Sequence, residues 1–151
     1  MSSAATPVCL ITGASSGIGA ALAREFARHG HTLVLTARRA AELDALADRI
    51  AGNGQPRPHV IAADIGAGDG IAQLEQALRE RGLEVAILVN NAGFGLLGAA
   101  ADLDLAQQLA IIDLYVRALT DLTLRFLPDI SRHAGGILHV ASIAGFLPGP
   151  G

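Results

Sequence analysis

The sequence predicts an α/β fold in which helices cover a parallel sheet. Short apolar runs alternate with longer stretches of helical periodicity, and the alternation repeats from one end of the chain to the other. This alternation is typical of strand–helix–strand units around a parallel sheet. With 151 residues, of which 51% are hydrophobic and 17% charged, the chain can bury one core. We therefore expect a single domain over residues 1–151.

Five apolar runs are the predicted strands of this sheet. Each run is unbroken, as in strands that are buried on both faces. The runs are residues 8–12, 32–36, 59–63, 85–89 and 137–141.

Four stretches between these runs have the periodicity of helices. Residues 18–28 place Ile18, Leu22 and Phe26 at four-residue spacing, and residues 40–51 repeat the pattern through Leu43, Leu46 and Ile50. A third helix is expected over residues 69–81. The fourth begins with Asp102 or Asp104 as its cap and runs to about residue 127, where Pro128 limits it.

Charge and lysine content exclude several classes of function. The net charge is −3, and the 11 basic residues are all arginines that form no cluster, so we expect no nucleic-acid partner. A mechanism that requires a lysine from these 151 residues is excluded, because the sequence contains none.

Cysteine and histidine usage gives two further expectations. The single cysteine, Cys9, cannot form an internal disulfide and lies in an apolar run, which indicates a reducing, cytoplasmic location. The five histidines are scattered along the chain, so we expect no metal site.

The first 23 residues carry no charged side chain, but they do not resemble a signal peptide or a membrane span. No basic residue precedes the apolar part, and glycines and serines between residues 13 and 19 interrupt it. We expect no membrane association.

A glycine-rich loop joins the first predicted strand to the first predicted helix. It reads Thr-Gly-Ala-Ser-Ser-Gly-Ile-Gly over residues 12–19. Glycines allow a pyrophosphate to approach backbone N–H groups at the start of a helix, where the helix dipole favours negative charge. The spacing differs from the commoner Gly-x-Gly-x-x-Gly pattern and from the phosphate loop that ends in Lys-Ser/Thr. Candidate binding residues are Gly13, Ser15, Ser16, Gly17, Ile18 and Gly19.

The end of the second predicted strand indicates which dinucleotide this loop binds. An acidic residue at this place would bind the ribose 2′-hydroxyl of NAD, but the sequence has Ala37 followed by Arg38 and Arg39. Guanidinium groups are the donors that a 2′-phosphate prefers. The sequence therefore favours NADP(H) over NAD(H).

Three motifs together resemble the short-chain dehydrogenase/reductase family, classical type. They are the glycine loop, the Asn-Asn-Ala-Gly segment over residues 90–93 after the fourth strand, and Ser142 at the end of the fifth strand. The resemblance extends from about residue 6 to the end of the chain.

The resemblance implies a Rossmann-type, doubly wound parallel sheet with strand order 3-2-1-4-5. It implies that Arg38 binds the 2′-phosphate and that Asp64 and Ile65 contact the adenine. Asn91, Ala92 and Gly93 would lie along the cofactor. Ser142 would hydrogen-bond the substrate, a small carbonyl compound or alcohol.

The sequence departs from the family pattern at two places. The family places a catalytic Tyr-x-x-x-Lys pair after the serine, whereas this chain ends nine residues after Ser142. Its only tyrosine, Tyr115, lies where the family has an asparagine and is followed four residues later by Leu119. We interpret Tyr115 as a packing residue of an apolar helix. We expect a domain truncated after the fifth strand, which leaves that strand as an unpaired edge.

Three functional hypotheses remain open. The chain is the cofactor-binding portion of an NADP(H)-dependent oxidoreductase that lacks its catalytic pair, or a regulatory nucleotide-binding module that pairs with a full-length relative. Alternatively, a partner chain supplies the missing tyrosine and lysine. The fourth helix and the open sheet edge are candidate surfaces for a homo- or hetero-oligomer.

Overall fold

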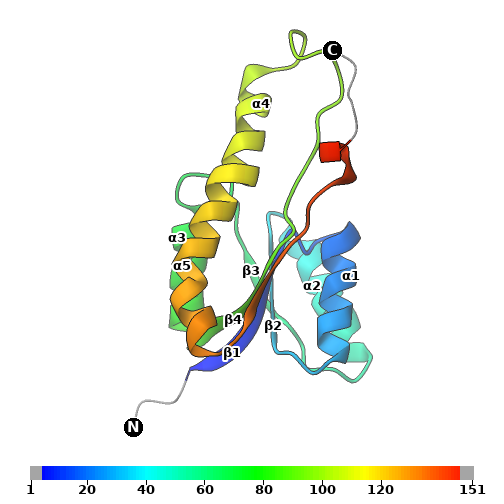
Figure 1. Cartoon of the computed structure of the whole chain (residues 1–151). Coiled ribbons are helices and arrows are strands. Elements are labelled where there is room, and N and C mark those ends of the chain that lie inside the picture. The colour runs from blue at the N-terminus through cyan, green and yellow to red at the C-terminus, as the bar shows by residue number, and fades with distance from the viewer. Residues whose placement is uncertain (1–4, 147–151) are drawn as a thin grey trace.

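The computed structural model describes residues 5–146, and its strands and helices alternate along the chain (Figure 1). The strands are β1 (Thr6–Thr12), β2 (Leu33–Ala37), β3 (His59–Ala62), β4 (Leu83–Asn90) and β5 (Gly136–His139). The helices are α1 (Gly17–Arg28), α2 (Ala40–Gly52), α3 (Gly70–Glu80), α4 (Leu105–Ile112) and α5 (Leu119–Arg132). A π-helical turn, η1 (Asp113–Ala118), joins α4 to α5, and a 3₁₀ turn, η2 (Ile143–Phe146), follows β5. The predicted domain also includes residues 1–4 and 147–151, which lie outside the described residues.

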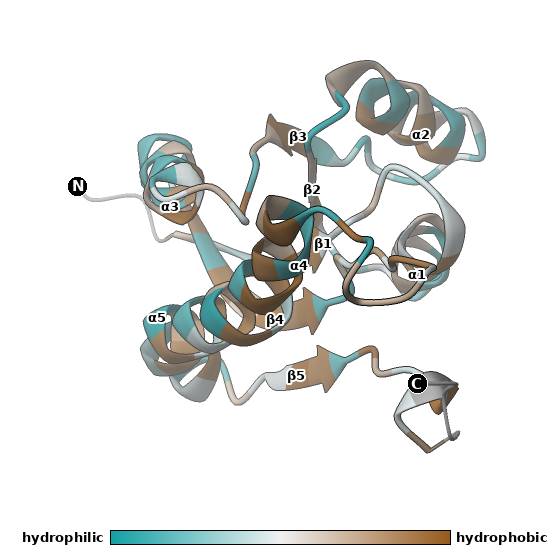
Figure 2. Ribbon diagram, turned by 90° about the horizontal axis from the view of Figure 1, so that it is seen from above, coloured by the Kyte–Doolittle hydropathy of each residue, from teal (hydrophilic) through white to brown (hydrophobic). Residues whose placement is uncertain are grey.

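The five strands form one parallel sheet in the order β3-β2-β1-β4-β5, which confirms the predicted topology. Helices α1 and α2 cover one face, and α3 and α5 cover the other (Figure 2). The chain order of the strands reverses between β1 and β4. In sheets of this kind ligands bind at such a reversal, beyond the carboxyl ends of the strands.

Each face of the sheet buries its own apolar cluster. Leu43, Leu46 and Ile50 of α2 pack beneath the sheet with exposed fractions of 2% or less, as their spacing predicts. On the other face, Leu74 of α3 and Leu122 of α5 are equally well buried.

Helix α1 buries a different face from the predicted one. Its buried residues are Gly19, Ala20, Ala23 and Ala27, whereas Ile18 is 60% exposed and Leu22 and Phe26 are only half-buried. Small side chains allow the helix backbone to approach the sheet closely. The prediction was wrong for Ile18 and right only in part for Leu22 and Phe26, which pack against the edge of the apolar cluster, because it used the largest apolar side chains to define the buried face.

The long fourth helix begins as predicted but continues past Pro128. Asp104 is its cap, since its carboxylate accepts a hydrogen bond from the Gln107 N–H at 2.9 Å. The predicted end near residue 127 is wrong, because α5 extends to Arg132. Pro128 removes one helical hydrogen bond on an exposed side, while Phe126 and Ile130 remain buried on either side of it.

Strand β5 is shorter and more exposed than predicted. It ends at His139, not at residue 141, and its last two residues are exposed. Among the described residues it pairs only with β4, so it forms the edge of the sheet, as expected. The prediction of burial on both faces was wrong here because an apolar run does not distinguish an edge strand from a central one.

Candidate functional site

The glycine loop connects β1 to α1 at the carboxyl edge of the sheet. Gly13 and Gly17 have φ angles of +65° and +56°, in a region that residues with a Cβ rarely adopt. The first N–H groups of α1 have no partner within the helix, and its first turn contains no acidic side chain. The Ser16 side chain does not cap these groups. This arrangement of donors suits an anion such as a pyrophosphate.

Two glycines of the loop pack directly against the segment after β4. A Cβ at Gly13 would lie 2.7 Å from Cα of Ala92, and a Cβ at Gly19 would overlap the Asn91 amide and the Gly13 carbonyl. The two motifs that the sequence singled out therefore form one layer. Any larger residue at either position would push them apart.

Hydrogen bonds hold the two segments together. The Asn91 side-chain amide donates to the carbonyl oxygens of Thr12 and Gly13 at 2.9 and 3.3 Å. The Thr12 hydroxyl donates to the Val89 carbonyl at 3.1 Å and accepts from the N–H groups of Asn91 and Ala92 at 3.0 and 3.1 Å. Sequence reasoning missed this role of Thr12, for which a polar residue ending an apolar strand was the available signal.

Of the two arginines after β2, Arg39 reaches the glycine loop. Its guanidinium donates to the hydroxyls of Ser15 and Ser16 at 3.0 and 3.1 Å and pairs with Glu42 at 3.3 Å. Arg38 is exposed and makes no hydrogen bond or ion pair within the described residues. Within residues 5–146, the edge of the loop therefore carries one guanidinium held by hydrogen bonds and, next to it in sequence, one without a hydrogen-bond or ion-pair partner.

The two residues predicted to contact the adenine differ in their surroundings. Asp64 is exposed, and its carboxylate accepts a hydrogen bond from the Gly66 N–H at 3.1 Å. Ile65 is 9% exposed and packs in the apolar cluster on the α3 side of the sheet. Only a small part of its side chain is thus available to a ligand.

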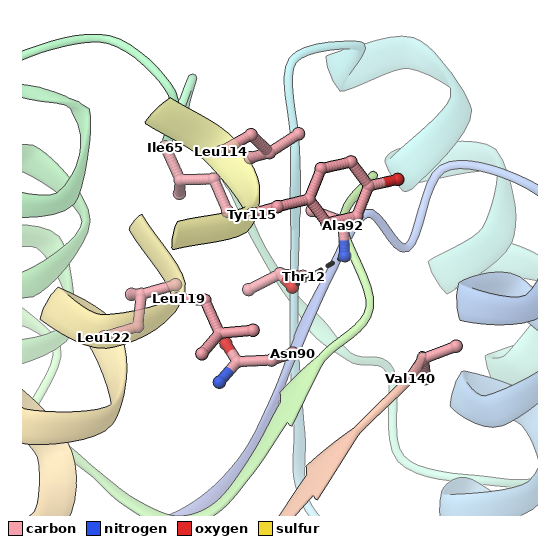
Figure 3. Close-up of a pocket in the computed structure, with 9 residues that line it drawn as sticks. All are labelled: Thr12, Ile65, Asn90, Ala92, Leu114, Tyr115, Leu119, Leu122 and Val140. Atoms are coloured by element: carbon pink, nitrogen blue, oxygen red, sulfur yellow. Dashed lines mark hydrogen bonds between the residues drawn. The ribbon is translucent and has the colours of Figure 1, made fainter. Parts of the chain in front are cut away.

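Tyr115 lies over the segment after β4, and its side chain is part of the lining of a small, partly open cavity of about 20 Å³ at the ends of β1 and β4 (Figure 3). Its hydroxyl donates to the Phe94 carbonyl at 3.0 Å, and the residue is 43% exposed. The interpretation of Tyr115 as a residue packed in an apolar helix was therefore incomplete, because the phenol also bonds to a segment outside its own helix. The cavity is lined by Thr12, Ile65, Asn90, Ala92, Leu114, Tyr115, Leu119, Leu122 and Val140.

Ser142 lies at the same edge of the sheet, just after β5. It is exposed, and its carbonyl accepts a hydrogen bond from the Gly145 N–H at 3.3 Å. The preceding segment is tied to β4 by a hydrogen bond from the Val140 N–H to the Asn90 carbonyl at 2.9 Å. The Asn90 side chain lies within hydrogen-bond distance of Thr123 in α5 and of His139 in β5. It thereby links β4 to both elements.

Two kinds of site are not found within residues 5–146. No group of three or more histidine, cysteine, aspartate or glutamate side chains there could hold a metal ion. In the same part of the chain, no helix has the length and apolar character needed to cross a membrane.

Solved structures of oxidoreductases share this fold. A short-chain dehydrogenase from Sphingobium yanoikuyae in complex with NADPH matches with a TM-score of 0.83 and 39% identity, over 94% of this chain and 56% of that one. L-Sorbose reductase from Gluconobacter frateurii, complexed with NADPH and L-sorbose, matches with a TM-score of 0.86 and 30% identity. That match covers 95% of this chain and 55% of the reductase.

Curated sequences agree with the structural matches. Sulfoacetaldehyde reductase 2 from Chromohalobacter salexigens is 37% identical over 147 residues, which are 95% of this chain and 58% of that protein. The chain thus spans little more than half the length of the relatives it matches. The family model described as short chain dehydrogenase matches residues 7–151. The chain belongs to the short-chain dehydrogenase family.

Proposed function

We propose that this chain forms the NADP(H)-binding part of a short-chain oxidoreductase. The observation that carries the proposal is the position of Arg39, whose guanidinium spans Ser15 and Ser16 beside the amino end of α1. A loop that offers backbone N–H groups, two hydroxyls and a guanidinium at one edge suits a dinucleotide with a third phosphate. The crystallised relatives that bind NADPH support the same choice.

Each part of the site has a role in holding the cofactor. The glycine loop, including Ile18 at its exposed end, binds the pyrophosphate, and Arg38 and Arg39 bind the 2′-phosphate. Asp64 and the exposed part of Ile65 lie beside the adenine. The segment from Asn91 to Gly93 supports the nicotinamide end, since it is braced against the glycine loop by the Thr12 hydrogen bonds.

The reaction of the whole protein is hydride transfer between the nicotinamide and a small carbonyl compound or alcohol. Ser142 donates a hydrogen bond to the substrate oxygen. A tyrosine normally titrates near pH 10 and requires a cationic neighbour to act at neutral pH, and these 151 residues contain no lysine. A general acid or base typically raises the rate of the chemical step by about 10²- to 10⁴-fold. We therefore expect this chain alone to turn over ketones or aldehydes very slowly.

Equilibrium titration of the purified chain with NADPH tests the proposal. Enhanced nicotinamide fluorescence that saturates in the micromolar range is the expected result. Circular dichroism on the same sample establishes that the chain is folded. A folded sample that does not bind NADPH at millimolar concentration contradicts the proposal.

A second candidate is a regulatory nucleotide-binding module that associates with a longer relative. It is favoured by an apolar stripe on α4 and η1, formed by Leu105, Leu109, Ile112 and Val116, each more than half exposed, and by the unpaired edge of β5. Light scattering after size-exclusion chromatography discriminates between the candidates. A module of this kind forms a dimer with the relative, whereas a chain that remains monomeric in its presence contradicts this candidate.

A further inference from the structure

Tyr115 lies in the π-helical turn η1, the only departure from α-helical geometry between Leu105 and Arg132. Single π turns within α-helices occur frequently at functional sites. This turn lies beside the segment that follows β4, and the Tyr115 ring extends from it toward Ala92 (Figure 3). The irregular turn thus coincides with the contact between the long helix and the carboxyl edge of the sheet.

The Tyr115 phenol and Gly93 fit each other closely. A Cβ at Gly93 would overlap the Tyr115 hydroxyl and would lie 2.8 Å from Cζ of the ring. No side chain can therefore occupy position 93 while the phenol keeps its place. The hydroxyl donates to the next carbonyl, that of Phe94, at 3.0 Å.

The Tyr115 side chain forms part of the wall of the small cavity. Its volume of about 20 Å³ is enough for one water molecule. The polar groups below include the Thr12 hydroxyl, which already makes three hydrogen bonds to β4 and the segment after it. Tyr115 and Thr12, whose hydroxyl accepts from the N–H groups of Asn91 and Ala92, thus line the same cavity.

We propose that Tyr115 is a positioning residue that holds the segment 93–98 in place at the nicotinamide end of the cofactor site. Its hydroxyl fixes the Phe94 carbonyl, and its ring limits the access of water to the ends of β1 and β4. The inference rests on the proposed NADP(H) site and assigns Tyr115 no proton transfer. Without the hydroxyl, the segment opens more often and the cofactor must order it on binding.

Tyr115→Phe tests this role, because it removes the hydroxyl and keeps the ring. Thr120→Val is the matched control, since Thr120 is an exposed hydroxyl on the same long helix with no hydrogen bond among the described residues. In cofactor-free Tyr115→Phe, the backbone order parameters of residues 93–98, measured by ¹⁵N relaxation, should fall from about 0.85, the value of a rigid backbone, toward about 0.6, because the hydroxyl no longer holds the Phe94 carbonyl. The dissociation constant for NADPH should rise about three- to fivefold. Thr120→Val should change neither quantity.

A spectroscopic measurement on the unmodified chain provides an independent readout. Tyr115 is the only tyrosine and the chain has no tryptophan, so tyrosine emission reports on this position alone. Saturation with NADP⁺ should change that emission beyond the inner-filter effect measured on free tyrosine. A residue with a purely structural role, distant from the cofactor, would give no such change.

Failure of the role inferred for Tyr115 can be distinguished from failure of the proposed NADP(H)-binding function. Unchanged order parameters of residues 93–98 in Tyr115→Phe overturn the inference, as do lower order parameters with unchanged NADPH affinity. An unaltered tyrosine emission on NADP⁺ binding overturns it as well. If the folded parent chain binds no NADPH, the proposed function fails, and the order-parameter comparison alone then decides whether Tyr115 holds this segment.

Discussion

The side-chain amide of Asn91 donates a hydrogen bond to the Thr12 carbonyl at 2.9 Å and thereby joins the segment after β4 to the start of the glycine loop. A second, longer bond from the same nitrogen reaches the Gly13 carbonyl at 3.3 Å. These residues are far apart in sequence and meet only because β1 and β4 are neighbours in the sheet. The proposed cofactor site therefore depends on a contact between two central strands.

Asn91→Ala should lower both stability and NADPH affinity. The change leaves the carbonyls of Thr12 and Gly13 without their side-chain donor, at a cost of about 1–3 kcal/mol in the free energy of unfolding. Urea denaturation measures this loss. Asn53→Ala, in the exposed turn after α2, is the control and should change stability by less than about 0.5 kcal/mol. Equal stabilities for the two variants would contradict the bracing role of Asn91.

Gly19→Ala should disturb the glycine loop, since the new methyl group would overlap the Asn91 amide and the Gly13 carbonyl. Overpacking of this kind costs about 1–3 kcal/mol. Gly52→Ala is the matched control, because Gly52 lies at the end of α2 with open space around it, and a gain of about 0.4–1 kcal/mol is expected there. Thermal unfolding of both variants and NADPH titration provide the comparison. A Gly19→Ala variant as stable as Gly52→Ala would argue against the close packing of the two motifs.

Arg39→Ala should selectively weaken the binding of NADPH. The guanidinium is exposed, which reduces its electrostatic contribution, so we expect a five- to tenfold rise in the dissociation constant for NADPH and little change for NADH. Arg38→Ala is the companion variant, and a smaller effect is expected because its side chain is not held over the loop. Parallel losses of NADPH and NADH affinity in Arg39→Ala would mean that Arg39 does not contact the 2′-phosphate.

The thiol of Cys9 should be unreactive in the folded chain. Cys9 is buried in β1 with 1% of its surface exposed, and this burial raises the pKa of the thiol to about 12. Only the thiolate reacts with alkylating agents. Because Cys9 is the only cysteine, the rate of labelling with iodoacetamide reports the opening of the sheet. We expect slow labelling in native buffer and rapid labelling in urea. Rapid labelling of the native chain would contradict the burial of β1.

Stability should fall in acid as Glu84 is protonated. A hydrogen bond with His133 and, secondarily, one from Arg132 hold the pKa of Glu84 below its ordinary value of 4.5, while burial opposes them. Because the pKa of Glu84 is lower in the folded chain than in the unfolded chain, the ionised carboxylate stabilises the fold at any pH above the unfolded-state pKa. This stabilisation is lost as the pH falls through the folded-state pKa. Melting temperatures from about pH 5 to pH 3 should therefore decline less in Glu84→Gln than in the parent chain. Identical declines would show that Glu84 is not the group responsible.

Much of the fold could be predicted because its signals are local. Apolar runs located all five strands, and the spacing of Leu43, Leu46 and Ile50 identified the buried face of α2. The same reasoning failed for α1, where alanines provide the buried face. It also placed the end of the long helix too early, because the packing of Phe126 and Ile130 outweighs the hydrogen bond lost at Pro128.

The candidate site was predictable in its motifs but not in its contacts. The residues of the turn after β1 indicate a glycine-rich loop that suits a pyrophosphate. Sequence cannot show which of two adjacent arginines reaches that loop, because this depends on hydrogen bonds to Ser15 and Ser16, which are more than 20 residues away in the chain. The roles of Thr12 and Tyr115 depend on distant partners, Asn91 and Phe94, and no residue type encodes the π turn that carries Tyr115.

The most direct test of the account compares the dissociation constants of NADPH and NADH for the unmodified chain under identical conditions. Both cofactors share the pyrophosphate, the adenine and the nicotinamide, and they differ in the 2′-phosphate. We predict that NADPH binds at least about tenfold more tightly, because the extra phosphate would meet the guanidinium groups of Arg38 and Arg39 and no carboxylate at position 37 repels it. Equal affinities, or a preference for NADH, would contradict it.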